Sequence, residues 1–367
     1  MQFIDLAAQQ ARIKNQLDKR ISAVLAHGQY IMGPEIRELE ERLADYIGVK
    51  YAVSVSSGTD ALLMPLMAYG IGPGDAVFVP SFTFVATAEV VSFLKATPIF
   101  VDVDENTYNM DLKSLETQIL RTIREGKLQP KLIIPVDLFG QPADYDEINK
   151  IAKQYNLIVM EDTAQGFGGI YKGRKAGSLA DVAATSFFPA KPLGCYGDGG
   201  MIFTDDEDLY QKLLSIRIHG QGIDKYTNIR IGINGRMDTL QAAVLLCKMD
   251  IFDEEIELRQ SVANNYNKLL EGKVKTPFVN EFNTSAWAQY TIASEERDLF
   301  MANLKKQNIP TAIYYPIPLH QQEAFVEVSD VQGNLPVSEK ISKMVFSLPM
   351  HPYLSEDSQE LIAEAIV

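Results

Sequence analysis

Apolar residues up to Thr204 switch between two spacings, and this predicts alternating strands and helices. Short runs rich in β-branched residues are typical of buried strands, whereas apolar residues three or four apart are typical of helices. The predicted strands are 51–55, 76–80, 97–101, 131–136, 157–161, 182–188 and 201–204. The predicted helices between them are 61–69, 86–94, 110–124 and 145–155. Because parallel strands need crossover connections, the alternation predicts an α/β fold with a mainly parallel central sheet covered by helices.

The pattern changes in the last third of the chain. One long helical spacing runs from Met237 towards Arg259, and strand-like runs follow at 287–292 and 311–315. This predicts a smaller C-terminal domain of mixed strand and helix. A chain of 367 residues is also longer than one ordinary core needs. We therefore expect a large α/β domain at 1–250 and a small α+β domain at 251–367.

Composition narrows the classes of function. Hydrophobic residues make up 46% of the chain and charged residues 22%, as in a globular protein with a filled interior. The net charge of -14 argues against nucleic-acid binding, which needs a basic face, so an anionic substrate would require a locally basic site. The two cysteines, Cys195 and Cys247, form no Cys-x-x-Cys pair, which argues against a disulfide framework. With no apolar run of membrane-spanning length and no signal-peptide pattern, we expect a cytoplasmic protein without a membrane partner.

One lysine and one acid follow two of the predicted strands. Lys191 lies in a proline-stiffened loop after strand 182–188, and Asp162 follows strand 157–161. Side chains at the carboxyl ends of parallel strands meet at the sheet edge where open α/β sheets bind ligands. A lysine that can form a Schiff base, facing an acid that can hold a pyridinium proton, suits pyridoxal phosphate. The sequence therefore predicts a pyridoxal-phosphate enzyme with Lys191 and Asp162 as catalytic residues.

Other residues expected at the same edge complete a cofactor site. Gly58 and Thr59 open a helix after a strand, where free backbone amides can bind phosphate, although the sequence also suits a plain helix cap. Ser186 is placed to donate to the same phosphate. Gln165 can reach a phenolic oxygen or lie on a helix surface. Phe84 offers a flat face to a pyridine ring or belongs to the core.

The sequence around other possible functional motifs argues against the functions that they would indicate. The glycines of 70–74 resemble a dinucleotide-binding loop, but a proline interrupts them and they close a helix. The chain has neither a phosphate-binding loop ending in Gly-Lys-Ser/Thr nor a Gly-x-Ser-x-Gly elbow. Its four histidines lack metal-ligand spacing, so we expect no metal site.

Several motifs in a fixed order make the chain resemble the DegT/DnrJ/StrS family of pyridoxal-phosphate-dependent nucleotide-sugar aminotransferases. The similar segments are 3–6, 33–35, 57–62, 80–84, 161–165, 186–200, 232–238 and 315–320. The resemblance covers the chain end to end and implies the fold-type I transferase fold. It also implies that Lys191 carries the cofactor as a Schiff base, that Asp162 pairs with the ring nitrogen, and that Gln165 contacts the phenolic oxygen.

The resemblance assigns the remaining cofactor contacts too. It implies that Gly58, Thr59 and Ser186 bind the phosphate and that Phe84 stacks on the ring. It further implies that Asn234 reaches the cofactor phosphate of the neighbouring subunit. The expected assembly is therefore a homodimer with shared active sites.

Within the family the chain looks most similar to enzymes that aminate UDP-2-acetamido-2-deoxy-3-oxo-glucuronate with L-glutamate as donor. Such enzymes supply amino sugars for surface polysaccharides, including the O-antigen of lipopolysaccharide. The clues are the segments 27–34 and 191–200. The residues implied to contact the UDP-sugar are Gly28, Tyr30, Arg236, Tyr314 and Tyr315. The Arg236 guanidinium would supply the positive charge that a carboxylate or pyrophosphate needs.

Two residues depart from the pattern of these similar enzymes, and two other functions remain as alternative hypotheses. Ala190 stands where a serine is expected and Tyr314 where a histidine is expected, so a UDP- or dTDP-linked keto-deoxysugar is the alternative substrate. A pyridoxal-dependent sugar dehydratase is a second enzyme hypothesis, against which Lys191 argues because those relatives carry histidine there. A regulatory protein that keeps the fold and binds the cofactor without turnover is the hypothesis from another class.

Overall fold

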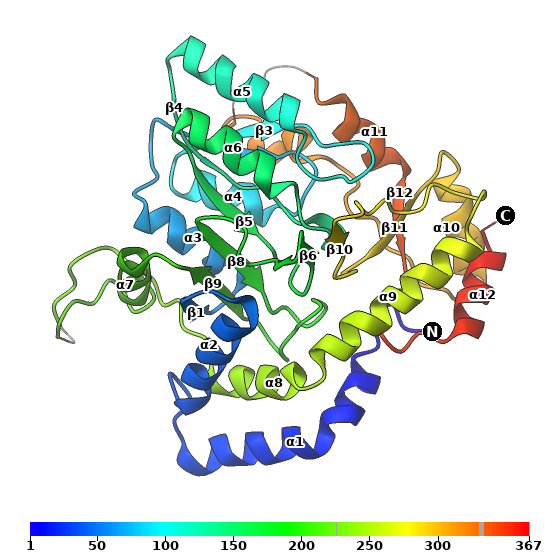
Figure 1. The fold of residues 1–367 in the computed structure, drawn as a ribbon, viewed down its shortest axis with the longest axis horizontal. Coiled ribbons are helices and arrows are strands. Elements are labelled where there is room, and N and C mark those ends of the chain that lie inside the picture. The colour runs from blue at the N-terminus through cyan, green and yellow to red at the C-terminus, as the bar shows by residue number, and fades with distance from the viewer. Residues whose placement is uncertain (225, 330–333, 367) are drawn as a thin grey trace.

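The computed structural model describes residues 1–224, 226–329 and 334–366, and a seven-stranded sheet lies at its centre (Figure 1). The strands lie in the order β1 (Tyr51–Val55), β9 (Gly200–Thr204), β8 (Val182–Ser186), β5 (Ile158–Asp162), β4 (Gln129–Ile133), β2 (Asp75–Pro80) and β3 (Thr97–Val101). β9 runs antiparallel to β1 and β8, and the other neighbouring pairs are parallel. The mainly parallel sheet predicted from the sequence is confirmed.

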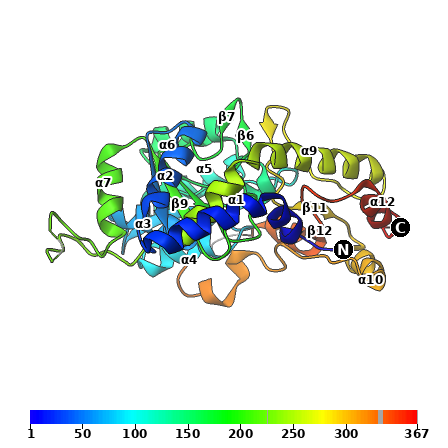
Figure 2. The same ribbon diagram turned by 90° about the horizontal axis from the view of Figure 1, so that it is seen from below.

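Helices cover both faces of this sheet because alternate strand residues point to opposite sides. In β2, Val77 and Val79 belong to one apolar cluster, whereas Ala76 and Phe78 belong to another. The first cluster includes residues of α3 (Gly58–Ala68), α4 (Ala86–Phe93) and α7 (Glu207–Ile216). The opposite face is covered by α5 (Leu112–Glu125), α6 (Tyr145–Tyr155), α2 (Pro34–Ile47) and α8 (Thr239–Met249). Figure 2 shows α5 and α6 on the other side of the sheet from α3 and α4.

The C-terminal third builds an apolar cluster of its own, to the right in Figure 1. The cluster takes residues from α9 (Phe252–Leu269), β11 (Tyr290–Ala293), α10 (Arg297–Lys306), β12 (Val345–Leu348) and α12 (Glu356–Glu364). α11 (Pro336–Met344) precedes β12 and contributes Ile341 to a different cluster. β11 and β12 pair antiparallel. The short strands β6 (Ile170–Tyr171), β7 (Arg174–Lys175) and β10 (Asn283–Thr284) form a third sheet. At the other end of the chain, α1 (Leu6–His27) packs on α8.

Several boundaries differ from those expected; for example, β8 ends at Ser186 and not at 188, and β11 begins at Tyr290 and not at 287. The helical spacing after Met237 is divided between α8 and α9, which are separated at 250–251. The strand expected at 311–315 is reduced to one bridge between Ala312 and Ser347. β4 ends at Ile133, before Pro135, because proline has no N–H to donate to the next strand.

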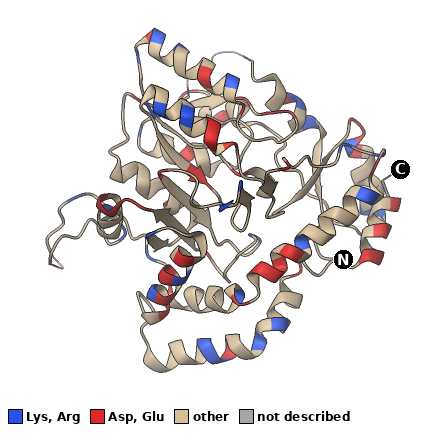
Figure 3. Ribbon diagram, viewed as in Figure 1, with Lys and Arg blue, Asp and Glu red and all other residues tan. Residues whose placement is uncertain are grey.

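Charged residues of both signs are interspersed along the outer helices (Figure 3). The overall balance is acidic, with 48 Asp and Glu against 34 Lys and Arg. Within the described ranges, no helix has the length and apolarity needed to cross a bilayer.

Candidate active site

The carboxyl ends of β5 and β8 place the two predicted catalytic residues at one edge of the sheet. Asp162 is the last residue of β5 and pairs with Ala184 of β8. Lys191 lies in the loop that follows β8, where its amine and the Asp162 carboxylate interact electrostatically. Burial lowers the pKa of the Lys191 amine, and the negative charge of Asp162 opposes that shift. The amine is thereby made easier to deprotonate than an exposed lysine.

The Asp162 carboxylate is buried and held by two donors. The Thr87 hydroxyl donates to Asp162 Oδ2 at 2.8 Å, and the backbone N–H of Ala164 donates to Oδ1 at 3.2 Å. Burial raises the pKa of Asp162, whereas these two hydrogen bonds and the nearby Lys191 lower it. Thr87 could not be predicted from the sequence, since the contact spans 75 positions and no motif marks that threonine.

Gln165 and two aromatic residues lie beside this pair. Gln165 Oε1 accepts from the backbone N–H of Phe139 at 2.8 Å, and its Nε2 donates to the Tyr315 hydroxyl at 3.1 Å. The amide nitrogen carries a second hydrogen, which can serve one further acceptor. The Tyr315 ring lies 6.3 Å from that of Phe84, and Phe84 is 52% exposed whereas Phe82 is buried. Of the two phenylalanines, Phe84 is therefore the one that offers a free face.

The start of α3 forms a cradle suited to an anion. Ser57 caps the helix by accepting from the backbone N–H of Asp60 at 3.1 Å. The N–H groups of Gly58 and Thr59, in the same first turn, have no partner within the helix. A Cβ at Gly58 would lie 2.5 Å from the Ser186 Cβ, so only glycine lets Ser186 approach the helix end. A phosphate fits this arrangement of amides, a hydroxyl and the helix dipole.

Gly28 and Tyr30 lie in a second region, at the end of α1. Gly28 ends that helix with a φ of 70°, a left-handed conformation that glycine adopts without strain. The carbonyl of Tyr30 accepts from the N–H of Thr239, the first residue of α8, at 2.9 Å. The Tyr30 side chain is 47% exposed and available to a ligand.

Asn234 and Arg236 follow an extended hairpin that projects at the far left of Figure 1. Arg236 Nε donates to Asn234 Oδ1 at 2.9 Å. The carbonyl of Gly235 between them accepts from the N–H of Ser56 at 3.0 Å. That bond places the loop beside the residues that open α3.

Tyr314 stands next to Tyr315, and their ring centroids are 5.8 Å apart in an edge-on arrangement. On its other side Tyr314 contacts Phe3, at 6.5 Å between centroids. Burial raises the pKa of Tyr314 and brings the pKa of Tyr315 above its ordinary value as well. Both phenols therefore stay protonated and can donate hydrogen bonds at neutral pH.

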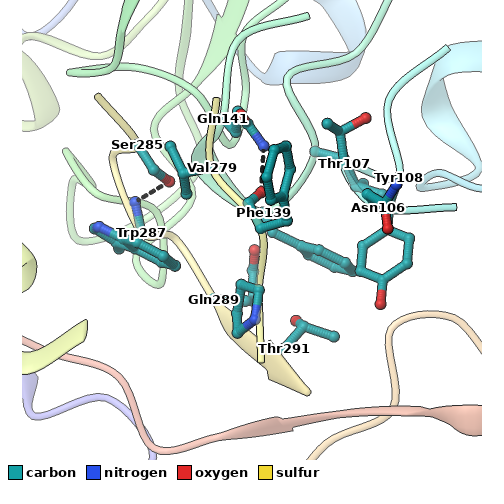
Figure 4. Close-up of a pocket in the computed structure, with 13 residues that line it drawn as sticks. Asn106, Thr107, Tyr108, Phe139, Gln141, Val279, Ser285, Trp287, Gln289 and Thr291 are labelled. Atoms are coloured by element: carbon teal, nitrogen blue, oxygen red, sulfur yellow. Dashed lines mark hydrogen bonds between the residues drawn. The ribbon is translucent and has the colours of Figure 1, made fainter. Parts of the chain in front are cut away.

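The cavity drawn in Figure 4 is lined by the segment 106–108, the turn at 138–141 that includes Phe139, and residues of the segment 277–291. Its volume is about 20 Å³, which is room for one water molecule. It cannot admit a substrate. Across the described part of the chain, no group of three His, Cys, Asp or Glu side chains is arranged to hold a metal ion.

A profile of the DegT/DnrJ/EryC1/StrS aminotransferase family matches residues 11–367. The chain belongs to this family. A solved structure from the family has the same fold as this chain. This aminotransferase from Brucella abortus superposes with a TM-score of 0.98 at 54% identity, covering 100% of this chain and 98% of that one. The prediction of a fold-type I transferase is confirmed.

Named relatives within the family cover the whole chain. A Pseudomonas aeruginosa protein named UDP-2-acetamido-2-deoxy-3-oxo-D-glucuronate aminotransferase is 52% identical over 367 residues, covering 100% of this chain and 99% of that protein. A Geobacillus stearothermophilus protein named pleiotropic regulatory protein is 40% identical, covering 99% and 97%. The Bacillus subtilis protein NtdA, solved with bound cofactor PMP, superposes with a TM-score of 0.87 at 29% identity, covering 99% and 82%.

Proposed function

We propose that this aminotransferase uses pyridoxal phosphate to move the amino group of L-glutamate onto a UDP-linked keto-sugar. The proposed acceptor is UDP-2-acetamido-2-deoxy-3-oxo-glucuronate, and the product is the corresponding 3-amino sugar. The observation that carries the proposal is the pairing of Lys191 with Asp162 beside an anion cradle. The 52% identity to a relative named for that reaction supports the choice of sugar.

The residues at the sheet edge fit the cofactor. Asp162 would hold the ring nitrogen, Phe84 would lie against the ring, and Gln165 has one amide hydrogen left for the phenolic oxygen. Gly58 and Ser186 would hold the phosphate together with Thr59. When bound, pyridoxal phosphate supplies an electron sink that stabilises a carbanion next to the transferred nitrogen.

Lys191 would then act as the proton carrier. Because burial lowers the pKa of its amine, Lys191 can be neutral at working pH and remove a proton from Cα of glutamate. In the second half of the exchange it would deliver a proton to the sugar carbon that receives nitrogen. Asp162, held by Thr87, would keep its negative charge towards the ring.

Arg236 and the two tyrosines would recognise the nucleotide sugar. The Arg236 guanidinium can bind a carboxylate or pyrophosphate through two parallel hydrogen bonds. Tyr315, whose ring lies beside that of Phe84, and its neighbour Tyr314 would offer protonated hydroxyls. Gly28 and Tyr30 would border the substrate from the end of α1.

The proposed assembly is a homodimer in which Asn234 serves the partner's cofactor phosphate. The hairpin before Asn234 exposes large apolar side chains that a monomer would leave in water, including Ile223 at 107% exposure and Ile231 at 84%. Exposed apolar patches on a projecting segment are typical of a protein interface. We further propose a cytoplasmic enzyme of surface-polysaccharide synthesis, with its domain boundary at residue 250.

An absorbance experiment tests the reaction. Glutamate should bleach the visible band of the purified holoenzyme, and the UDP-linked 3-oxo-glucuronate should restore it with formation of the amino sugar. Lys191→Ala should show neither change. Cofactor binding without bleaching would favour the regulatory alternative, to which the relative named as a regulatory protein lends support. Restoration only by keto-deoxysugars that lack a carboxylate would refute the uronate assignment.

A further inference from the structure

A buried arginine lies against the outer edge of β1, the strand that leads to the anion cradle. β1 is the first strand in the order of the main sheet, so within the described sheet its outer backbone groups face no further strand. Arg217 follows α7 directly, and its side chain is buried. Its Nη1 donates to the carbonyl of Ser54 in β1 at 3.1 Å and lies 3.2 Å from Ser54 Oγ. The guanidinium therefore replaces part of a neighbouring strand.

Glu40 of α2 binds the same point of β1 and the same guanidinium. Its Oε1 accepts from the backbone N–H of Ser54 at 2.9 Å and from the Ser54 hydroxyl at 2.8 Å. The third donor to this oxygen is Arg217 Nη1, at 2.5 Å. Because the Arg217 side chain is only 6% exposed and that of Glu40 15%, water screens this ion pair little, and its hydrogen bonds fix the guanidinium in one place.

The main chain of Arg217 holds the loop that carries Asn234. Its carbonyl accepts from the N–H of Gly235 at 3.0 Å, and the carbonyl of Gly235 accepts from the N–H of Ser56 at 3.0 Å. Ser56 follows β1 directly. The hydrogen bonds thus close a ring that leads from the Arg217 side chain into β1, on to Gly235 and back to the Arg217 carbonyl.

Two further bonds join this loop to the residues around Arg217. The N–H of Ile233 donates to the carbonyl of Ile216 at 2.9 Å, and the N–H of His219 donates to the carbonyl of Ile233 at 2.9 Å. Both bonds fix the loop to the segment 216–219, and the Arg217 side chain fixes that segment to β1. Loss of the guanidinium would therefore let the segment and the loop shift together relative to the sheet.

The position of this ring distinguishes it from an ion pair that only stabilises the fold. β1 leads to Gly58 and Thr59, assigned above to the cofactor phosphate of the same subunit, whereas the loop carries Asn234, assigned to the phosphate in the partner subunit. The ring thus joins two segments that bind phosphate in the proposed dimer.

We propose that Arg217 is a positioning residue: by fixing Gly235 against β1, it holds Asn234 where that side chain can bind the cofactor phosphate of the partner subunit. The role of Asn234 rests on the function proposed above. The anchoring of the loop does not, because the bonds that carry it involve no ligand.

A double-mutant cycle on cofactor affinity tests this role. Asn234→Ala removes a hydrogen bond to a charged phosphate, so the dissociation constant for pyridoxal phosphate, from fluorescence titration of the apoenzyme, should rise at least about tenfold. Arg217→Met should raise it at least about fivefold, and the double variant should bind no more weakly than Asn234→Ala alone, because Arg217 acts through Asn234. Losses that multiply in the double variant would overturn the proposal.

Pyridoxal, which lacks the phosphate, separates positioning from general damage. Its affinity should stay within about twofold of native in Arg217→Met, since no phosphate contact is lost. Arg259→Met is the matched control, because Arg259 is similarly buried and its Nη1 donates to the carbonyl of Trp287 at 2.9 Å. The control should lower the melting midpoint and leave both affinities unchanged. An equal loss of pyridoxal and pyridoxal phosphate affinity in Arg217→Met would contradict a positioning role.

Arg217→Lys provides a milder variant, which carries the test if Arg217→Met does not fold. The ammonium keeps the charge beside Glu40 but lacks the planar guanidinium that reaches Glu40 and Ser54 together. Its affinity for pyridoxal phosphate should lie between those of native protein and Arg217→Met. Native affinity in every folded Arg217 variant would refute the proposal.

Hydrogen exchange provides a readout that needs no cofactor. In Arg217→Met, amides of the segment 230–236 should exchange at least about tenfold faster than in native protein, while those of β8 and β9 keep native rates. Native exchange throughout 230–236 would show that Arg217 does not anchor the loop. A native protein that fails to bind pyridoxal phosphate would instead refute the proposed function, and the exchange rates would still decide whether the loop is anchored.

Discussion

At the scale of single residues, the proposed chemistry depends on how Asp162 keeps its charge inside the protein. Burial alone raises the pKa of its carboxyl, and a neutral acid could not hold a ring proton by charge. The donors from Thr87 and Ala164 counter that shift. A hydroxyl 75 positions away in the sequence therefore stabilises this charge together with a backbone N–H of the motif itself.

We expect Thr87→Val to weaken cofactor binding without unfolding the protein. The change keeps the side-chain shape and removes a hydrogen bond to a charged group, which contributes about 1.5–3 kcal/mol, so the dissociation constant for pyridoxal phosphate should rise at least about tenfold. Fluorescence titration of the apoenzyme measures this rise. Thr291→Val, a buried threonine bonded to Ser347 in the small sheet, is the matched control and should leave the affinity unchanged. Equal affinity in Thr87→Val and native protein would contradict the role of Thr87.

Lys191→Arg tests whether a neutral amine is required. Arginine keeps the positive charge but remains protonated throughout the accessible pH range, so it cannot take a proton from glutamate. Turnover should fall by about 10²–10⁴-fold. In native enzyme the rate should decline as pH falls below the lowered pKa of Lys191, since protonation removes the base. A variant that keeps native turnover would eliminate Lys191 as the proton carrier.

At the scale of elements, a buried histidine joins the end of β2 to the C-terminal third of the chain. Ser81 Oγ lies 2.6 Å from His320 Nδ1, and His320 Nε2 lies 3.3 Å from Glu339 Oε1 of α11. Ser81 also accepts, at its carbonyl, from the N–H of Leu319 at 2.7 Å. These bonds hold the segment that carries Tyr314 and Tyr315 against the sheet edge.

His320→Ala should therefore loosen that segment and raise KM for the sugar several-fold more than it changes the affinity for pyridoxal phosphate. The change removes the side-chain partner of the buried Ser81 hydroxyl, which costs about 1–3 kcal/mol of stability. Steady-state kinetics and thermal unfolding measure the two effects. His320→Asn, whose oxygen can replace Nδ1 towards Ser81, should keep most of the sugar affinity. The link has no role in substrate binding if both variants show native KM.

At the scale of the whole molecule, the proposed sharing of active sites predicts complementation between two inactive variants. Asn234→Asp should repel a phosphate in the partner subunit, and Lys191→Ala should remove the base in its own subunit. Coexpression of the two with different tags should restore roughly a quarter of native activity, because half of the dimers are mixed and each has one complete site. Activity no higher than that of the separate variants would show that Asn234 does not serve a neighbouring subunit.

Local patterns in the sequence determined the architecture and the location of the site. Strand spacing and β-branched runs predict all seven strands of the main sheet, and the need for crossover connections between parallel strands places Asp162 and Lys191 at one edge. The predicted ends of elements differ from the structure where proline interrupts the hydrogen bonds between strands, as after β4, and where two helices follow each other, as at 250–251. The spacing of apolar residues is the same in two consecutive helices, so it does not show where the chain changes direction between them.

Tertiary structure alone decided which distant side chains meet. Thr87 donates to Asp162 and Ser186 lies against Gly58, yet nothing in the local spacing of these residues predicts either contact. Periodicity reports which face of an element is buried, whereas the partner across that face depends on how layers of the fold pack. The amino-acid pattern thus set the reaction type and the edge of the sheet, and the packed fold set the hydrogen bonds that tune each group for it.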